Sequence, residues 1–179
     1  MKSIVIKDKE FELFIDSEII EANIRRIAAK MNSDLKDLNP MFIVVLNGSF
    51  MFAGELMKYV TIPSEITFVR LSSYHGTSST GKIHEVLGLN DNIEGRTVVI
   101  VEDIVDTGNT MKSLLSQLNK RRTKEIMIST LLFKPDSLIH DIKLDYIALE
   151  IPDDFIVGYG LDYEGYGRNL RDIYKLKNS

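Results

Sequence analysis

The stretch at residues 98–110, VVIVEDIVDTGNT, constrains the fold of this chain more than any other. It opens with four β-branched apolar residues, a run typical of a strand buried on both faces. Glu102 and Asp103 then close the predicted strand, and a polar loop at 106–110 leads into a helical pattern. A buried strand, an acidic tip, a small-residue loop and a helix together form one unit of an α/β sheet.

The same alternation of apolar runs and helical patterns continues along the chain. A helix expected at about 17–31 follows the capping residue Asp16 and places Ile20, Ile24 and Ile27 near helical spacing. The other predicted elements are strands at 3–6, 11–15, 41–46, 65–71, 83–89, 125–133, 146–150 and 155–160, and helices at 50–59 and 110–121. Strands that alternate with helices indicate an α/β fold with a mainly parallel sheet covered on both faces.

Ligands of such sheets bind beyond the carboxyl ends of the strands. Three loops follow apolar strands at that edge, namely 47–49, 103–110 and the region after 133. Their shared position predicts a single site.

Composition narrows the classes of protein that the chain can represent. With 179 residues, of which 44% are hydrophobic, it is expected to form one domain with a sizeable core. Cysteine is absent, which excludes a disulfide framework and fits a reducing compartment such as the cytoplasm. The net charge of −4 argues against a nucleic-acid partner, and no apolar run approaches the roughly 20 residues of a membrane helix.

The residues at the acidic tip and in the loop after it are of the types that bind phosphate, sugar hydroxyls and Mg²⁺. Backbone N–H groups and hydroxyls at 106–110 can bind a phosphate, helped by the dipole of the following helix. Glu102 and Asp103 can hold a sugar diol or a hydrated Mg²⁺ ion. The simpler alternative is two solvated acids at a strand end, with Asn109 or Thr110 as the N-cap of the helix. The cap is compatible with phosphate binding, and the combined pattern favours a phosphorylated sugar.

The pattern of apolar residues, Glu102-Asp103, two apolar residues and Asp106-Thr-Gly-x-Thr110 resembles the phosphoribosyl diphosphate signature of type I phosphoribosyltransferases, specifically the hypoxanthine-guanine group. Further similar segments are the pyrophosphate loop at 46–49, the mobile catalytic loop from residue 71, Lys134, the purine-binding hood at 151–153 and 155–163, and Arg168. They span about residues 44–171. The resemblance implies a phosphoribosyltransferase-type parallel sheet flanked by helices, in a single domain of residues 1–179. A small hood is expected from about 1–16 and 135–179.

The resemblance also assigns roles around the sugar. It implies that the ribose hydroxyls meet Glu102 and Asp103, and that the 5′-phosphate is held by Asp106, Thr107, Gly108, Asn109 and Thr110. Pyrophosphate and its lid are assigned to Leu46, Asn47, Gly48, Ser73, Tyr74 and Arg168, and Mg²⁺ to Glu102, Asp103 and Asp162. Many members carry lysine where Asn47 stands, so the pyrophosphate role here falls to the backbone, whose 46–47 peptide is often cis in the family.

For the purine, the resemblance implies a 6-oxopurine that reacts with 5-phosphoribosyl 1-diphosphate. Asp106 is the expected acid/base near N7, and Lys134 is the expected donor to the 6-oxo group. Phe155 is expected to stack on the base, with the Ile156 backbone and Asp162 nearby. A lysine donor favours oxo over amino purines, because the amino group of adenine already presents hydrogens at that position.

Three alternatives remain beside this interpretation. The chain could prefer xanthine, or it could be a nucleic-acid-binding regulator on the same fold. A phosphoryl-receiver domain is a third alternative, but it needs acids after the 41–46 strand, which instead ends in Asn47-Gly48. The resemblance further implies a homodimer or homotetramer.

Overall fold

The computed structural model describes residues 2–73, 83–87, 89 and 91–177. The strands are β1 (Ser3–Ile6), β2 (Lys9–Ile15), β3 (Met41–Leu46), β4 (Glu65–Ser73), β5 (Ile83–Leu87), β6 (Thr97–Val105), β7 (Glu125–Phe133), β8 (Tyr146–Glu150), β9 (Ile156–Val157) and β10 (Ile173–Leu176). The helices are α1 (Ser17–Asp34), α2 (Phe50–Tyr59), α3 (Asn109–Asn119) and the 3₁₀ turn η1 (Pro135–Ser137).

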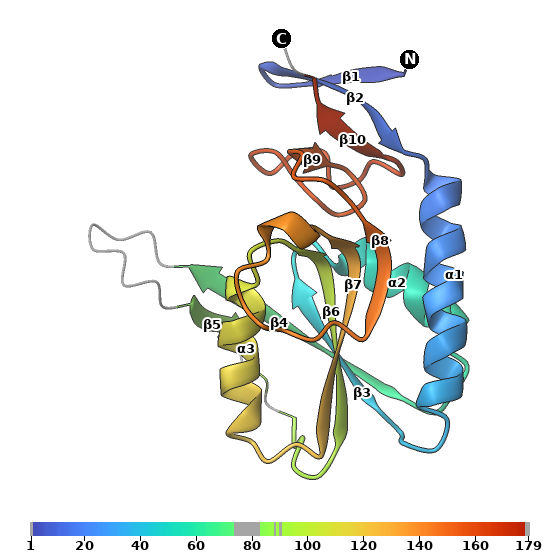
Figure 1. The fold of residues 1–179 in the computed structure, drawn as a ribbon, viewed down its shortest axis with the longest axis vertical. Coiled ribbons are helices and arrows are strands. Elements are labelled where there is room, and N and C mark those ends of the chain that lie inside the picture. Colours follow the sequence, from blue (N-terminus) through green and yellow to red (C-terminus); the bar gives the residue numbers. More distant parts are fainter. Residues whose placement is uncertain (1, 74–82, 88, 90, 178–179) are drawn as a thin grey trace.

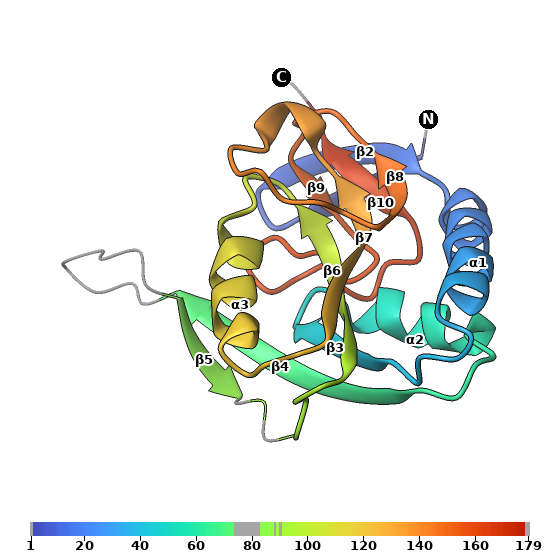
Figure 2. The same ribbon diagram turned by 60° about the horizontal axis from the view of Figure 1, so that its bottom comes forward.

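A six-stranded sheet forms the body of the molecule, in the order β5-β4-β3-β6-β7-β8. Strands β4, β3, β6, β7 and β8 run parallel, and β5 pairs antiparallel with β4. Helices α1 and α2 cover one face and α3 covers the other (Figures 1 and 2). The predicted α/β fold with its mainly parallel sheet is confirmed.

Alternate side chains of the central strands supply two separate hydrophobic cores. Phe42 and Val44 of β3 face α1 and α2, whereas Ile43 and Val45 face α3. Strand β6 divides its valines and isoleucines in the same way. A strand that is buried on both faces has apolar residues at every position. Such a continuous apolar run is visible in the sequence, so these strands could be predicted.

The order of the strands places a topological switch point between β3 and β6. From β3 the chain moves through α2 to β4 on one side, and from β6 it moves through α3 to β7 on the other. The loops that leave β3 and β6 therefore diverge and leave a crevice beyond the carboxyl ends of the two strands, the usual place for a ligand in such sheets.

A second, antiparallel sheet, β1-β2-β10-β9, forms a small hood built from both ends of the chain (Figure 1). We expected its C-terminal part to begin near residue 135. Instead, β8 pairs parallel with β7 in the main sheet, so the hood begins after β8. The strand expected at 155–160 is limited to β9, because Gly158, Tyr159 and Gly160 all have positive φ and form a turn.

Among the residues described, no helix combines the length and the apolar character needed to cross a bilayer.

Candidate functional site

The acid pair on β6 lies where this strand loses one of its neighbours. Pairing of β6 with β3 ends at Val101, while pairing with β7 continues to Val105. The strand therefore runs past the acids, and the prediction that it ends at Glu102 and Asp103 is wrong. Backbone pairing with β7 extends it, and the missing β3 partner opens the space beside both carboxylates.

Glu102 and Asp103 are almost fully buried, with 6% and 9% of their surfaces exposed. Glu102 Oε2 has no hydrogen-bond partner among the described residues, whereas Asp103 Oδ1 accepts from the backbone N–H of Ile104 at 3.0 Å. Burial, followed by the neighbouring charge of Asp103, raises the pKa of Glu102 well above its ordinary value. A buried carboxylate with a free oxygen is costly unless a ligand supplies a partner.

The loop after β3 packs directly against this pair. The Leu46–Asn47 peptide bond is cis. A Cβ placed on Gly48 would stand 1.5 Å from Asp103 Oδ2, and one placed on Gly160 would stand 1.9 Å from the Gly48 carbonyl oxygen. The tip of β6, the loop after β3 and the hood turn therefore meet at these two glycines, which leave no space for a side chain.

The 106–110 loop ends in an open helix N-terminus. The N-cap of α3 is Gly108, with φ of 82°, and it offers no side chain to cap the helix. The expected cap by Asn109 or Thr110 is wrong, because both residues already lie inside the first turn. The N–H of Asn109 makes only a long contact with Thr107 Oγ1, at 3.5 Å, and among the described residues the next two N–H groups, of Thr110 and Met111, have no partner. These groups therefore remain available, which is the arrangement that binds anions at helix N-termini.

Two cavities share these elements. One of about 280 Å³ is lined by the acid pair and by all five residues of the 106–110 loop. The other, of about 310 Å³, is lined by Leu46, Asn47, Gly48, Asp162 and Arg168. Both cavities include Glu102, Asp103 and Thr110, so they adjoin along the acid pair.

Lys134 lies at the end of β7 beside the same loop. Its ammonium group is buried, 3.7 Å from Asp106 Oδ2 and 2.8 Å from Asp153 Oδ1. The hydrogen bond from Lys134 lowers the pKa of Asp153. The ion pair between Lys134 and Asp153 thus places the hood beside the buried Lys134 ammonium group and near the carboxylate of Asp106.

Phe155 and Ile156 follow Asp153 in the hood. Phe155 is 49% exposed and makes an edge contact with Tyr163 at a centroid distance of 5.9 Å. The side chain of Ile156 is buried, and its backbone pairs with Lys175 of β10. Phe155 therefore keeps part of its ring free, while Ile156 can offer only main-chain groups.

Asp162 and Arg168 form an ion pair at 2.5 Å, and the other Asp162 oxygen accepts from Gly165 N at 2.6 Å. Arg168 also donates to the Gly160 carbonyl at 2.7 Å. Within the described part of the chain, no three acids or histidines are close enough to hold a metal by themselves. The predicted metal residues Glu102, Asp103 and Asp162 line one cavity without forming a closed cluster.

Ser73 is the last residue of β4, and Tyr74, the other residue assigned to the lid, lies outside the described residues. The sequence does not predict the pairing of Asp153 with Lys134 or any role for His140. The resemblance includes Asp153 in the hood segment at 151–153 but gives it no role of its own, and nothing in the surrounding sequence signals His140. Both residues reach the site by contacting a residue far away in the sequence. Asp153 contacts Lys134, and His140 contacts Asn109.

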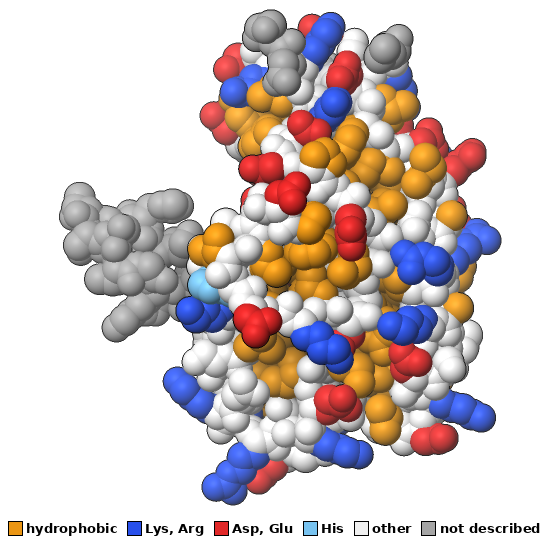
Figure 3. All heavy atoms as spheres, viewed as in Figure 1, with side chains coloured by type: hydrophobic (Ala, Val, Ile, Leu, Met, Phe, Trp, Pro, Cys, Tyr) orange, Lys and Arg blue, Asp and Glu red, His pale blue; other side chains and the backbone are white. Residues whose placement is uncertain are grey.

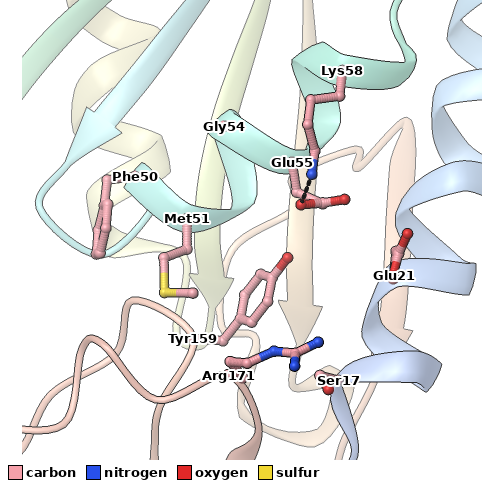
Figure 4. Close-up of a pocket in the computed structure, with 9 residues that line it drawn as sticks. All are labelled: Ser17, Glu21, Phe50, Met51, Gly54, Glu55, Lys58, Tyr159 and Arg171. Carbon is pink, nitrogen blue, oxygen red and sulfur yellow. Dashed lines mark ion pairs between the residues drawn. The ribbon is translucent and has the colours of Figure 1, made fainter.

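A separate cavity of about 380 Å³ lies behind the hood turn, between α1 and α2 (Figure 4). The buried ring of Tyr159 points into it, with Glu55 and Arg171 at its edges (Figure 4). Burial and the charge of Glu55 raise the pKa of this tyrosine. None of the predicted site residues that the structure describes in full lines this cavity. The buried Tyr159 precedes Gly160 in the same turn and fixes that turn against α1 and α2.

Comparison with known proteins gives a consistent result. The sequence model of the phosphoribosyl transferase domain family matches residues 14–164. The hypoxanthine-guanine phosphoribosyltransferase of Streptococcus pyogenes serotype M3 is 42% identical over 166 residues, which cover 92% of each chain. That of Streptococcus pneumoniae is 41% identical over 161 residues, or 89% of each chain.

Comparison with solved structures leads to the same group of proteins as comparison with sequences. A crystal structure of a hypoxanthine phosphoribosyltransferase from Staphylococcus aureus superimposes with a TM-score of 0.87 at 38% identity, covering 93% of this chain and 91% of the other. A hypoxanthine-guanine phosphoribosyltransferase from Bacillus anthracis gives 0.86 at 32% identity, with 93% and 97% covered.

Proposed function

The chain belongs to the phosphoribosyltransferase family, and we propose that it is a purine-salvage enzyme that transfers the 5-phosphoribosyl group of 5-phosphoribosyl 1-diphosphate to hypoxanthine and guanine. The products are the purine 5′-monophosphates, IMP and GMP, and pyrophosphate. One observation carries the proposal. A buried acid pair with an unpartnered oxygen, an uncapped helix N-terminus and a buried lysine meet at the switch point of the sheet.

The phosphorylated sugar fits the β6–α3 connection. The 5′-phosphate would accept hydrogen bonds from the open N–H groups of α3 and from the hydroxyls of Thr107 and Thr110. The two ribose hydroxyls are donors, and Glu102 and Asp103 are acceptors. The hydroxyls would provide the free oxygen of Glu102 with the partner that it lacks.

Pyrophosphate fits the neighbouring cavity, where Gly48 and Asn47 present backbone groups and Arg168 lies on the wall. The residues present also fit Mg²⁺, because this ion usually keeps several waters and takes only one or two carboxylates beside the phosphates. Of Glu102, Asp103 and Asp162, one or two would hold the ion directly, and the rest would hold it through its water ligands. When bound, Mg²⁺ supplies charge neutralisation to the departing pyrophosphate.

The purine fits between Asp106, Lys134 and the hood. Lys134 would donate to the 6-oxo group, with the open part of the Phe155 ring beside the base. A ring nitrogen attacks C1 as the bond from C1 to pyrophosphate breaks, and Asp106 takes the proton from N7. The sugar passes through an oxocarbenium-like state, so the protein acts mainly by positioning and electrostatics.

The decisive assay measures pyrophosphate release from 5-phosphoribosyl 1-diphosphate with hypoxanthine, guanine, xanthine or adenine, each with and without Mg²⁺. We expect release with hypoxanthine and guanine, little with adenine, and none without the metal. A chain that releases pyrophosphate with none of the four bases would contradict the proposal.

The two functional alternatives predict other results, one in the same pyrophosphate assay and one in an added gel-retardation experiment. Preferential use of xanthine would identify a xanthine-preferring transferase. A regulator would bind the sugar diphosphate without transfer and would retard RNA or DNA in a gel. The regulator is disfavoured because acidic and basic side chains interleave on the described surface in Figure 3, with no basic stripe on that face.

We also propose that the enzyme is cytoplasmic and assembles as a homodimer or homotetramer. The absence of cysteine supports a reducing compartment. Assembly is supported by Ile66 and Phe68, which lie on the same face of β4 and are each 41% exposed. Light scattering after gel filtration would determine the oligomeric state.

A further inference from the structure

A short segment after β7, residues 138–142, lies against the outside of the phosphate loop at 106–110. The backbone N–H of Ile139 donates to the Thr107 carbonyl at 3.2 Å. A Cβ on Gly108 would stand 2.9 Å from Leu138 Cδ1 and 3.0 Å from Ile142 Cδ1. The 138–142 segment thus contacts the loop at the glycine where α3 begins.

One side-chain contact joins the same two segments. His140 Nε2 lies 2.7 Å from Asn109 Oδ1. Because an amide oxygen can only accept, Nε2 carries the proton in this arrangement and donates it. The histidine is partly exposed and comes from a loop 31 residues away in sequence, so the contact depends on the tertiary fold.

The contact has a consequence for the helix N-terminus. Short polar side chains near the start of a helix tend to turn back and accept from its free N–H groups. Asn109 is the first residue of α3, and its own N–H lies 3.5 Å from Thr107 Oγ1. In the described part of the chain, no side chain accepts from the N–H groups of Thr110 and Met111 that follow. With its oxygen engaged by His140, Asn109 is held away from the N–H groups that a phosphate would need.

We propose that His140 is a positioning residue for the ribose 5′-phosphate, and that it acts through the side chain of Asn109. The inference rests on the function proposed above. His140 does not touch the substrate. It fixes Asn109 and, with the 138–142 segment, the geometry of the loop that binds the phosphate.

The test compares the wild type with His140→Phe and His140→Gln. The loss of one hydrogen bond predicts a KM for 5-phosphoribosyl 1-diphosphate raised by about fivefold in His140→Phe, with kcat within about twofold. His140→Gln keeps an N–H donor on a side chain of similar reach, so its KM should stay within about twofold of the wild type. Ile139→Ala is the matched control, because this neighbour is 67% exposed and its backbone contact remains.

The second arm places His140→Phe in an Asn109→Ala background. If His140 acts through Asn109, the phenylalanine has no further effect on KM there. The inference is overturned by an unchanged KM in His140→Phe, by equal losses in His140→Phe and His140→Gln, or by additive effects in the double variant.

Isothermal titration calorimetry measures the binding of 5-phosphoribosyl 1-diphosphate to the same proteins directly. This measurement separates the inference from the proposed function. A wild type that binds the sugar diphosphate but transfers nothing contradicts the proposed function, and the same comparisons are then made on Kd. A wild type that does not bind it at all overturns both.

Discussion

Asp103 and Gly48 are in direct contact across the switch point, so close that a Cβ on the glycine would stand 1.5 Å from the Asp103 carboxylate. Gly48→Ala must therefore displace either Asp103 or the loop that we propose presents backbone groups to pyrophosphate. Because a displacement of about 1 Å can cost 100-fold in rate, we expect kcat/KM to fall by about that factor. Steady-state kinetics with hypoxanthine measure the effect.

Gly54→Ala is the matched control for this substitution. Gly54 lies inside α2, and apart from its own helix no atom of the described residues is within 4 Å of its Cβ position. Alanine should stabilise the helix by roughly 0.5–1 kcal/mol and leave kcat/KM unchanged. Equal activity of Gly48→Ala and Gly54→Ala would show that the contact with Asp103 is unimportant.

Asp106→Asn tests the acid/base role. The side chain of Asp106 is 45% exposed and lies 3.7 Å from Lys134. Asparagine keeps the shape and an acceptor oxygen but cannot take a proton from N7, so kcat should fall by about 10²–10⁴-fold while the sugar diphosphate still binds. Retention of full turnover would remove Asp106 from that role.

Glu102→Gln should raise the stability of the ligand-free protein while it lowers the affinity for the sugar. In the ligand-free protein, burial and Asp103 raise the pKa of Glu102, so the folded state binds this proton more tightly than the unfolded chain does. Stability is then lost as pH rises above about 4.3, the ordinary value for glutamate. Glutamine should remove that loss of stability, and in the proposed role of Glu102 it should also weaken binding of the ribose hydroxyls.

The expected gain at pH 7 is about 1.4 kcal/mol for each pH unit by which the pKa is raised, or a Tm higher by about 3 °C or more. It should disappear near pH 4, where the glutamate is protonated in both states. Scanning calorimetry from pH 4 to 8 without ligands measures it. A Tm that falls at pH 7 in Glu102→Gln would contradict this account of the buried acid.

Asp172 behaves in the opposite way. This buried carboxylate accepts from Lys2 Nζ at 2.5 Å and from Ser17 N at 3.0 Å, and the hydrogen bond from Lys2 is the main reason that its pKa is lowered to about 2. Its contribution is present above about pH 4 and is lost as pH falls toward 2. Asp172→Asn should destabilise the protein by about 1–3 kcal/mol at pH 7, and the difference should shrink between pH 4 and 2.

Denaturant unfolding at several pH values would follow this difference, with the exposed Asp37→Asn as control. A constant difference between wild type and Asp172→Asn from pH 7 to pH 2 would contradict the linkage.

Much of the main sheet could be predicted from the sequence. The bounds of β3 and β7 agree with those expected, because strands buried on both faces need uninterrupted apolar runs. The bounds of α2 and β8 also agree. The extension of β6 to Val105 was missed, since backbone pairing with β7 and not side-chain polarity decides where that strand ends. Nor could the sheet that β8 joins be predicted, because its residues suit either sheet.

The site shows the same division. The residues of the 102–110 segment were predicted together because they are adjacent in the chain and form one strand–loop–helix unit. The contact of Gly48 with Asp103, the pair of Lys134 with Asp153 and the contact of His140 with Asn109 could not be predicted, because each joins loops that only the tertiary fold brings together.

The hood has a practical consequence for protein engineering. Strands β1 and β10, from opposite ends of the chain, flank the same strand β2. A short linker could therefore join the two ends without crossing the molecule. New ends could be opened in the turn at 35–38, which precedes β3 at the edge of the sheet away from the acid pair. Such a circularly permuted chain would preserve every residue of the crevice.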